Sequence, residues 1–195
     1  MDKKETIFQC GKELFSSKGF KDTNVADITK MAGIAAGTFY LYYPSKENLF
    51  IEIFMQENLK LKEAIHNQVN PDDDPMTVIM QITHLNLKGI AANPILREWY
   101  NKDVFQKIEQ KFRETDQKAN FDFMYEDYYA AIKKWQAEGK MRADIDCEMI
   151  MALFTAVINT DTHKEEIGIQ YFPQLLEYLF QFVVDGLTNV SGHRE

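Results

Sequence analysis

The sequence predicts an all-α protein in which three short N-terminal helices are joined by a long fourth helix to a larger helical C-terminal region. Two observations carry this prediction. Apolar residues recur at helical spacing along most of the chain, and no window alternates cleanly enough for a β-strand. Glycine and proline are few and stand between these apolar stretches, where helices begin and end. With 45% apolar and 13% aromatic residues, the chain has ample material for a core.

Capping residues set the expected ends of the helices. Gly19 suits the left-handed position after a first helix, Asn24 caps a second helix that Gly33 ends, and Ser45 caps the fourth. The expected N-terminal helices are therefore about 7–18, 25–32, 36–42 and 46–69. Later helices are expected to start at Pro75 and Pro94 and to span about 103–114, 118–138, 147–162 and 173–188.

The overall charge of −8 argues at first against nucleic acid as a partner. Within residues 1–55, however, basic and acidic side chains are equal in number, so the whole acidic excess lies in residues 56–195. The basic residues of this segment are Lys3, Lys4, Lys12, Lys18, Lys21, Lys30 and Lys46, and the acidic ones are Asp2, Glu5, Glu13, Asp22, Asp27, Glu47 and Glu52. The N-terminal segment therefore lacks the net negative charge that would repel DNA.

Several sequence features indicate the compartment. Cys10 and Cys147 lie far apart and have no C-x-x-C partner, so we expect two buried thiols in a reducing environment. The N-terminus lacks the apolar segment of a signal peptide, and the longest apolar run, Met149–Ile158, is too short to cross a bilayer. We expect a cytoplasmic protein with no membrane partner.

The sequence gives little support to catalysis. It contains no G-x-G-x-x-G, P-loop or G-x-S-x-G string. The histidines are scattered, and none has a second ligand four residues away: His66, His84, His163 and His193. We expect no enzyme activity, no cofactor and no metal site.

The second and third expected helices, joined through residues 32–34, fit a helix-turn-helix, whose second helix enters the major groove of DNA. In this helix Phe39 and Tyr43 are four residues apart and can face inward. The side chains that can then face outward toward DNA are those of Thr38, Tyr40 and Tyr42. Periodicity alone leaves a second interpretation open, in which the whole aromatic cluster is core.

Leu14-Phe15 and Gly19-Phe20 precede the string KDTNVADITKMAGIAAGTFYLYYPSKENLF. Together these matches, between Ile7 and Phe54, strongly resemble the DNA-binding signature of the TetR family of transcriptional regulators. The resemblance implies that Thr38 and Tyr40 touch base edges or nearby phosphates, and that Tyr42 and Lys46 bind phosphate. Thr23 and Asn24 would hold phosphate at the start of the second helix. The DNA-binding residues expected on this resemblance are Thr23, Asn24, Ala36, Gly37, Thr38, Tyr40, Leu41, Tyr42 and Lys46.

Ala35 departs from the family pattern, which commonly has serine or threonine here to cap the recognition helix. Loss of such a cap costs about 1 kcal/mol and removes a hydroxyl group. Because Ala35 and Ala36 offer methyl groups instead of hydrogen bonds, we expect base readout to depend on thymine methyl contacts and on Thr38 and Tyr40.

The last two expected long helices are apolar on more than one side, so both sides must be buried. The family resemblance implies a two-helix dimer surface, which would form a four-helix bundle with a second copy. Burial of both sides within one chain is the alternative. The expected interface residues are Met151, Phe154, Thr155, Ile158, Leu176, Phe180, Val183, Val184 and Leu187.

Aromatic residues gather on the middle helices, and an aromatic cleft suits an apolar or planar ligand. The candidate pocket residues are His84, Trp99, Tyr100, Phe105, Phe112, Phe121, Met124, Tyr125 and Tyr128. The alternatives are ordinary core for the aromatics and a hydrogen-bonded core histidine for His84. Glu126 and Asp127 would suit a cationic ligand, or they are solvated surface charges.

The resemblance to the TetR family implies a ligand-responsive transcriptional regulator. It would act as a homodimer that represses from a palindromic DNA operator and is released by a small apolar or aromatic molecule. An enzyme and a helical scaffold without DNA activity are the rival classes. The expected domains are residues 1–50 for the helix-turn-helix and 51–190 for ligand binding and dimerisation, with 191–195 as a frayed tail.

Overall fold

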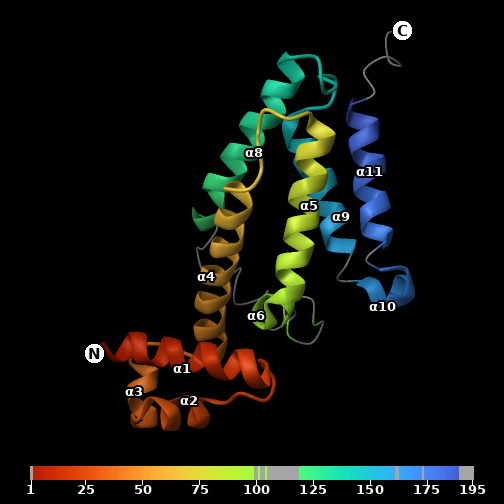
Figure 1. Ribbon diagram of the computed structural model, residues 1–195. Coiled ribbons are helices and arrows are strands. Elements are labelled where there is room, and N and C mark those ends of the chain that lie inside the picture. The colour runs from red at the N-terminus through yellow and green to blue at the C-terminus, as the bar shows by residue number, and fades with distance from the viewer. Residues whose placement is uncertain are drawn as a thin grey trace. The chain divides into compact units, whose positions relative to one another are not determined.

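The structure is a computed structural model (Figure 1) that describes residues 2–98, 101, 104, 119–160, 163–172 and 174–188, with backbone only for 119–125 and 127. All regular elements in these ranges are helical, which confirms the predicted all-α class. None of the helices described there combines the length and the apolar character that crossing a bilayer requires.

The N-terminal helices are α1 (Lys3–Lys18), α2 (Val25–Ala32), α3 (Ala36–Tyr40) and α4 (Lys46–His66). The four helices lie where the sequence predicts them, except that α1 begins about four residues earlier than expected and α3 and α4 end earlier. The end of α3 has a local cause, because the N–H groups of Leu41 and Tyr42 donate to carbonyls only three residues back. Such bonds tighten the last turn and close the helix.

The later elements are α5 (Pro75–Ala92), α6 (Pro94–Arg97), α8 (Ala119–Ala137), α9 (Cys147–Thr160), α10 (Lys164–Ile167), η3 (Ile169–Tyr171) and α11 (Gln174–Thr188). Asn93 caps α6 and Asp146 caps α9, and both helices begin where the sequence predicts them. The short α10 and η3 were not expected, and most of the helix expected at 103–114 lies outside the described residues.

The chain forms two compact units that are not continuous in sequence. Unit 1 comprises Met1–His66 and Asn86–Asp116, and unit 2 comprises Asn67–Leu85 and Gln117–Glu195. Helix α5 thus supplies residues to both. The predicted domain boundary at residue 50 stays a prediction, and the tail at 191–195 lies outside the described residues.

The core of unit 1 is built around aromatic rings. Phe15, Phe20 and Phe50 pack with ring centroids 4.9–6.0 Å apart. Helix α6 adds Ile95 and Leu96, both buried, so the core of the three N-terminal helices includes residues from much later in the chain.

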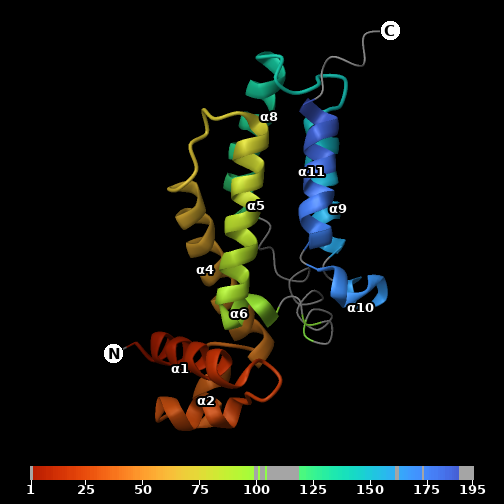
Figure 2. The same ribbon diagram turned by 45° about the vertical axis from the view of Figure 1, so that its right-hand side comes forward.

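The core of unit 2 lies among α5, α8, α9 and α11. Trp135, Ile150 and Leu187 are buried there together with Cys147, as predicted for this thiol, whereas Cys10 in unit 1 is only half-buried. Helices α9 and α11 run side by side along this unit, next to each other in Figure 1 and one behind the other in Figure 2.

Candidate functional site

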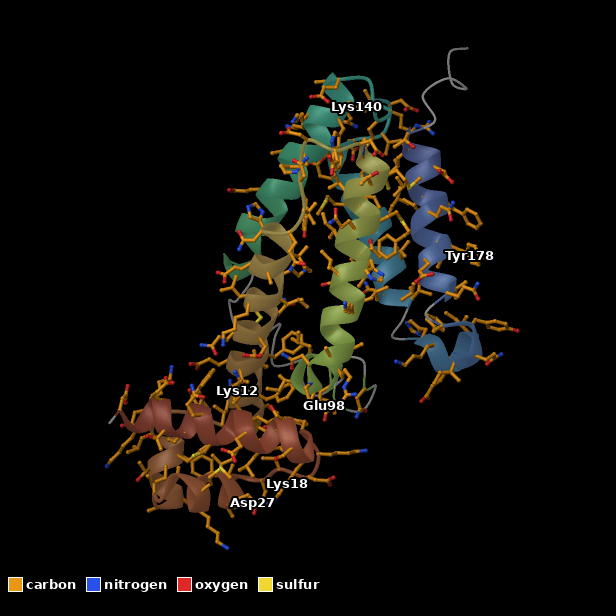
Figure 3. The ribbon with its side chains drawn as sticks, viewed as in Figure 1. Lys12, Lys18, Asp27, Glu98, Lys140 and Tyr178 are labelled. Carbon is orange, nitrogen blue, oxygen red and sulfur yellow. The ribbon has the colours of Figure 1, made fainter. Side chains whose placement is uncertain are left out.

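The polar groups in and around the turn between α1 and α2 bond to other groups of the protein. Gly19 ends α1 with a φ of 80°, and its carbonyl accepts a hydrogen bond from the Thr23 hydroxyl at 2.8 Å. Thr23 is fully buried, so the predicted phosphate contact of its side chain is wrong. Asn24 is exposed at the start of α2, where its Oδ1 accepts from the Asp27 N–H at 2.8 Å. The Asp27 carboxylate pairs with Lys18 at 3.3 Å (Figure 3).

The turn between α2 and α3 brings the start of α3 to the surface. Gly33 adopts the left-handed conformation, with φ 65° and ψ 33°, that the turn requires. Ala35 precedes α3 and makes no side-chain capping bond, as the sequence predicts. Ala35, Ala36 and Gly37 are all exposed, so α3 presents its first turn to solvent as methyl groups and bare backbone.

Two buried aromatic residues anchor α3. Phe39 and Tyr43 are buried with ring centroids 5.9 Å apart, as their spacing predicts. Burial, and secondarily the Glu52 carboxylate, raises the pKa of Tyr43 far above its ordinary value, so the phenol stays neutral. Glu52 also pairs with Lys4 at 2.9 Å. These contacts fix α3 against α1 and α4.

The outward side of α3 and its last turn carries the remaining residues of the aromatic cluster. Tyr40 and Tyr42 are exposed, and Leu41 is 81% exposed. Thr38 is half-buried beside them. The sequence interpretation in which the whole cluster is core therefore fails. This surface offers hydroxyl and methyl groups, and no charged side chain lies between Ala36 and Tyr42.

Lys46 at the start of α4 has a role that sequence reasoning missed. Its ammonium donates to the backbone carbonyls of Phe20 at 2.8 Å and Thr23 at 2.7 Å, and it lies 4.4 Å from the Phe20 ring centroid. Two of the three donors of this ammonium are thus directed at backbone carbonyls of the protein itself. Lys46 therefore holds the turn between α1 and α2 on α4.

We expect Lys46→Ala to lower the free energy of unfolding by about 1–3 kcal/mol, because it leaves two backbone carbonyls without their donor. Urea denaturation measures this loss. Lys30→Ala, which removes an exposed lysine of α2, is the matched control and should change stability little. Equal stability of the two variants would contradict the structural role of Lys46.

The segment that follows α5 is attached to the turn between α1 and α2. The Glu98 carboxylate accepts the backbone N–H of Phe20 at 2.9 Å and the side-chain amide of Asn101 at 3.3 Å. Figure 3 shows Glu98 beside the end of α1. A Cβ on Gly19 would lie 2.6 Å from the Glu98 Oε1, so glycine also gives this carboxylate its room.

A second carboxylate joins α1, α4 and the same segment. Glu57 on α4 accepts hydrogen bonds from Lys12 at 2.7 Å, Asn93 at 2.9 Å and Lys60 at 3.2 Å. Desolvation favours a higher pKa for Glu57, but these hydrogen bonds outweigh it and hold the pKa below its ordinary value. Glu57 is therefore an ionised carboxylate at neutral pH with three donors around it.

The predicted dimer residues of α9 and α11 divide into two groups. Leu176, Phe180, Val184 and Leu187 are buried within the chain, so their assignment to a dimer surface is corrected. Their side of α11 faces α9, as the stacked rings of Phe154 and Phe180 show at 6.1 Å. The residues that keep exposed or half-exposed side chains are Met151, Phe154, Thr155, Ile158 and Val183. Sequence reasoning missed the exposed Met149, Tyr178 and Phe182.

The predicted ligand pocket falls mostly outside the described residues. This applies to Trp99, Tyr100, Phe105 and Phe112, and to the side chains of Phe121, Met124, Tyr125 and Asp127. His84 is exposed on α5, so its interpretation as a core histidine is wrong. Tyr128 is half-buried and Glu126 is exposed.

Sequence comparison places the N-terminal segment in a known family. Residues 7–53 match the family model described as "Bacterial regulatory proteins, tetR family". The chain is 38% identical over 77 residues to the uncharacterized HTH-type transcriptional regulator YvdT of Bacillus subtilis, which covers 40% of each protein. The alignments with the first curated relatives span less than half of those proteins' own length.

Solved structures share the fold over nearly the whole chain. The fatty acid degradation regulator FadR of Bacillus halodurans matches with a TM-score of 0.64 at 20% identity, covering 100% of this chain and 98% of that one. FadR of Bacillus subtilis, solved in complex with stearoyl-CoA, matches with a TM-score of 0.62 at 16% identity, covering 95% and 98%. Regulators of this family are not enzymes, which agrees with the sequence prediction. With an all-helical fold, an exposed α3 and this match over residues 7–53, the chain belongs to the TetR family of helix-turn-helix transcriptional regulators.

Proposed function

We propose that this protein is a cytoplasmic, homodimeric repressor that binds a palindromic DNA operator and leaves it when a small apolar or aromatic effector binds. One observation carries the proposal. Helix α3 is anchored by two buried rings and presents Tyr40, Leu41 and Tyr42 to solvent beside an uncapped, side-chain-poor first turn. A helix built only for its own core would not expose three large side chains in succession.

The chemistry of α3 indicates how DNA would be read. Tyrosine hydroxyls can bond to base edges or phosphates, and the methyl groups of Leu41 and Ala36 can contact thymine methyls. Thr38 would add a hydroxyl at the edge of this surface. Phosphate contacts, which set register and affinity, would come from Asn24 and from Lys46 beyond its internal bonds. We therefore propose an operator whose half-sites contain thymines facing α3.

Selection of genomic fragments on the purified full chain tests this proposal. The selected fragments should share an inverted repeat, with half-site centres about one helical turn of DNA apart, roughly 34–36 Å, or a multiple of it. Tyr40→Phe and Leu41→Ser should shift the selected bases. Enrichment of no sequence above random fragments, at low salt as well as at physiological salt, would reject the DNA-binding role.

The outer side of α9 and α11 supports the homodimer. Tyr178 and Phe182 stack on this side of α11, with ring centroids 6.1 Å apart, and both are exposed. Gly186, one turn farther on, is an exposed helical glycine at which a Cβ would meet nothing within 4 Å. Glycine in mid-helix costs roughly 0.5–1 kcal/mol relative to alanine, and the close approach of a partner helix would account for its presence here.

The effector is the least defined part of the proposal. Because the Bacillus subtilis FadR structure holds stearoyl-CoA, a long-chain acyl-CoA is the first compound to titrate. Binding should weaken the operator complex, and by linkage DNA should weaken effector binding by the same factor. If acyl-CoAs and a panel of planar aromatic compounds leave operator affinity unchanged, the release step fails while DNA binding stands.

Movement of segment 93–98 would transmit effector binding to the DNA-binding helices and so release the operator. The Glu98 carboxylate accepts a hydrogen bond from the Phe20 N–H. The Glu57 carboxylate accepts hydrogen bonds from both Lys12 and Asn93. Movement of this segment would therefore pull on the turn that precedes α2 and, through Lys12, on α1. We propose that the effector displaces it.

We expect Glu98→Ala to weaken operator binding by about threefold to tenfold. A hydrogen bond to a charged group contributes about 1.5–3 kcal/mol, and we expect part of this loss at the α1–α2 turn to be transmitted to DNA binding. Glu98→Gln keeps an acceptor oxygen and should bind nearly as the parent does. Amide hydrogen exchange tests the bond itself, because the protection of the Phe20 N–H from exchange should fall in Glu98→Ala but not in Glu98→Gln. Equal protection in both variants would contradict the role of Glu98.

A further inference from the structure

Residues 163–172, the described part of the chain between α9 and α11, form a folded segment in which no residue is fully buried. Neither α10 nor η3 contains a buried residue. Yet the backbone closes on itself through Gly168 N–H to Lys164 at 2.8 Å and Tyr171 N–H to Gly168 at 3.0 Å. Meanwhile Ile167 is 41% exposed, Ile169 61% and Tyr171 57%. Apolar side chains held on the surface by a defined backbone indicate a surface that is covered by something else.

Gly168 keeps this segment compact. Its φ of +120° lies in the region that side chains rarely adopt, and a Cβ there would meet the Tyr171 ring at 2.9 Å. The Tyr171 ring therefore lies directly against Gly168. The two isoleucines flank this turn in a fixed geometry, one at the end of α10 and the other at the start of η3.

The exposed large apolar side chains of unit 2 gather on neighbouring elements. Among its described residues, they all lie on α9, α10, η3 and α11: Met149, Ile158, Ile167, Ile169, Tyr171, Tyr178 and Phe182. In Figure 3 Tyr178 projects from the side of α11 that faces away from α5, and α10 extends toward the same side. Figures 1 and 2 both show α10 beyond the lower end of α11.

The exposed area of these apolar side chains can be compared with the largest apolar patch of a typical monomer and with the area that a stable complex buries. Taking roughly 200 Å² for a fully exposed large side chain, the four on α9 and α11 expose about 400 Å². That value is ordinary for the largest apolar patch of a monomer, which runs to about 300–600 Å². The three on α10 and η3 add about 300 Å², and the total approaches the ~800 Å² that each partner buries in a stable complex.

We propose that α10 and η3 belong to the homodimer interface, where Ile167, Ile169 and Tyr171 pack against a second copy of this chain. The inference rests on the homodimer proposed above and extends its interface beyond the two long helices. A two-fold interface uses the same patch on both copies, so the segment of each copy would be covered by the other copy.

Sedimentation equilibrium of the full chain over a range of concentrations tests this. Ile169→Glu places a charge on the proposed interface and should raise the dimer dissociation constant by about tenfold or more, because an unpaired charge must be buried. Gln170→Glu is the matched control, since it adds the same charge at the neighbouring exposed position, and it should shift the constant by less than about threefold. Both positions are exposed, and circular dichroism should show unchanged helix content.

Two further measurements separate this inference from the homodimer itself. Phe182→Glu on α11 should dissociate the dimer whether or not α10 takes part. If Phe182→Glu acts and Ile169→Glu behaves as Gln170→Glu does, the homodimer stands and the role of α10 and η3 is overturned. A parent chain that stays monomeric overturns both. A benzophenone amino acid at position 169 should also cross-link to a second chain, and cross-linking only within one chain would contradict the inference.

Discussion

Replacement of Gly37 by alanine is expected to stabilise the folded chain and at the same time to weaken operator binding by about thirtyfold, or about 2 kcal/mol. Gly37 is an exposed residue inside α3, and a Cβ added there would meet nothing within 4 Å. Nothing within the protein requires glycine at this position, and alanine favours the helix by roughly 0.5–1 kcal/mol. In the proposed DNA complex the requirement comes from outside the chain, because the backbone of α3 would approach the DNA closely at this position.

Urea denaturation and operator titration of the same variant measure the two opposite effects. Ser16→Ala, an exposed alanine substitution on α1, is the control and should bind the operator as the parent does. A Gly37→Ala protein that is more stable and binds with unchanged affinity would show that α3 does not approach DNA through its first turn. Such a result would require a different face for base readout.

The second large effect is expected at Glu57. Glu57→Gln should lower the free energy of unfolding by about 1–3 kcal/mol at pH 7, because each hydrogen bond to a charged group contributes about 1.5–3 kcal/mol and glutamine keeps only part of them. The side chain of Glu57 is 12% exposed, whereas Lys12 is 30% exposed, so solvent screens the pair only in part. Glu63→Gln on the exposed side of α4 is the matched control and should change stability little.

The pH dependence of this difference has a definite sign. The folded pKa of Glu57 lies below its ordinary value, so folding favours the ionised carboxylate. The stabilisation is therefore fully present above the unfolded pKa of about 4.3 and is lost as the pH falls through the lower folded pKa. The stability gap between the parent and Glu57→Gln should be constant from pH 6 to 8 and close in acid. A gap that persisted undiminished at pH 3 would contradict the ionic role.

The sequence predicted those parts of the fold that depend on neighbours in the chain. The Asn24 cap is found where it was expected, and Asn93 and Asp146 cap helices that begin at their expected starts; each of these caps acts within three residues. The buried pair Phe39 and Tyr43 follows from helical spacing alone. For the same reason the existence and order of the described long helices were predictable, and their ends were missed by only a few residues.

The parts that were missed depend on residues far apart in sequence. Thr23 has the hydroxyl expected of a phosphate ligand, but burial beside α4 turns that hydroxyl inward. The partner of Phe20 N–H is Glu98, 78 positions later, and no local pattern marks it. On α11 both sides are apolar, so periodicity could not tell that Phe180 faces α9 and Phe182 faces solvent.

The contribution of α6 to the core of unit 1 also bears on how this protein is made. Ile95 and Leu96 fill the same buried cluster as Phe15, Phe20 and Phe50, and all five are almost completely buried. A nascent chain that has released only residues 1–66 from the ribosome would leave these rings partly uncovered. The core of unit 1 is therefore completed only after α6 has been synthesised, and residues 117–195 of unit 2 are translated after that point.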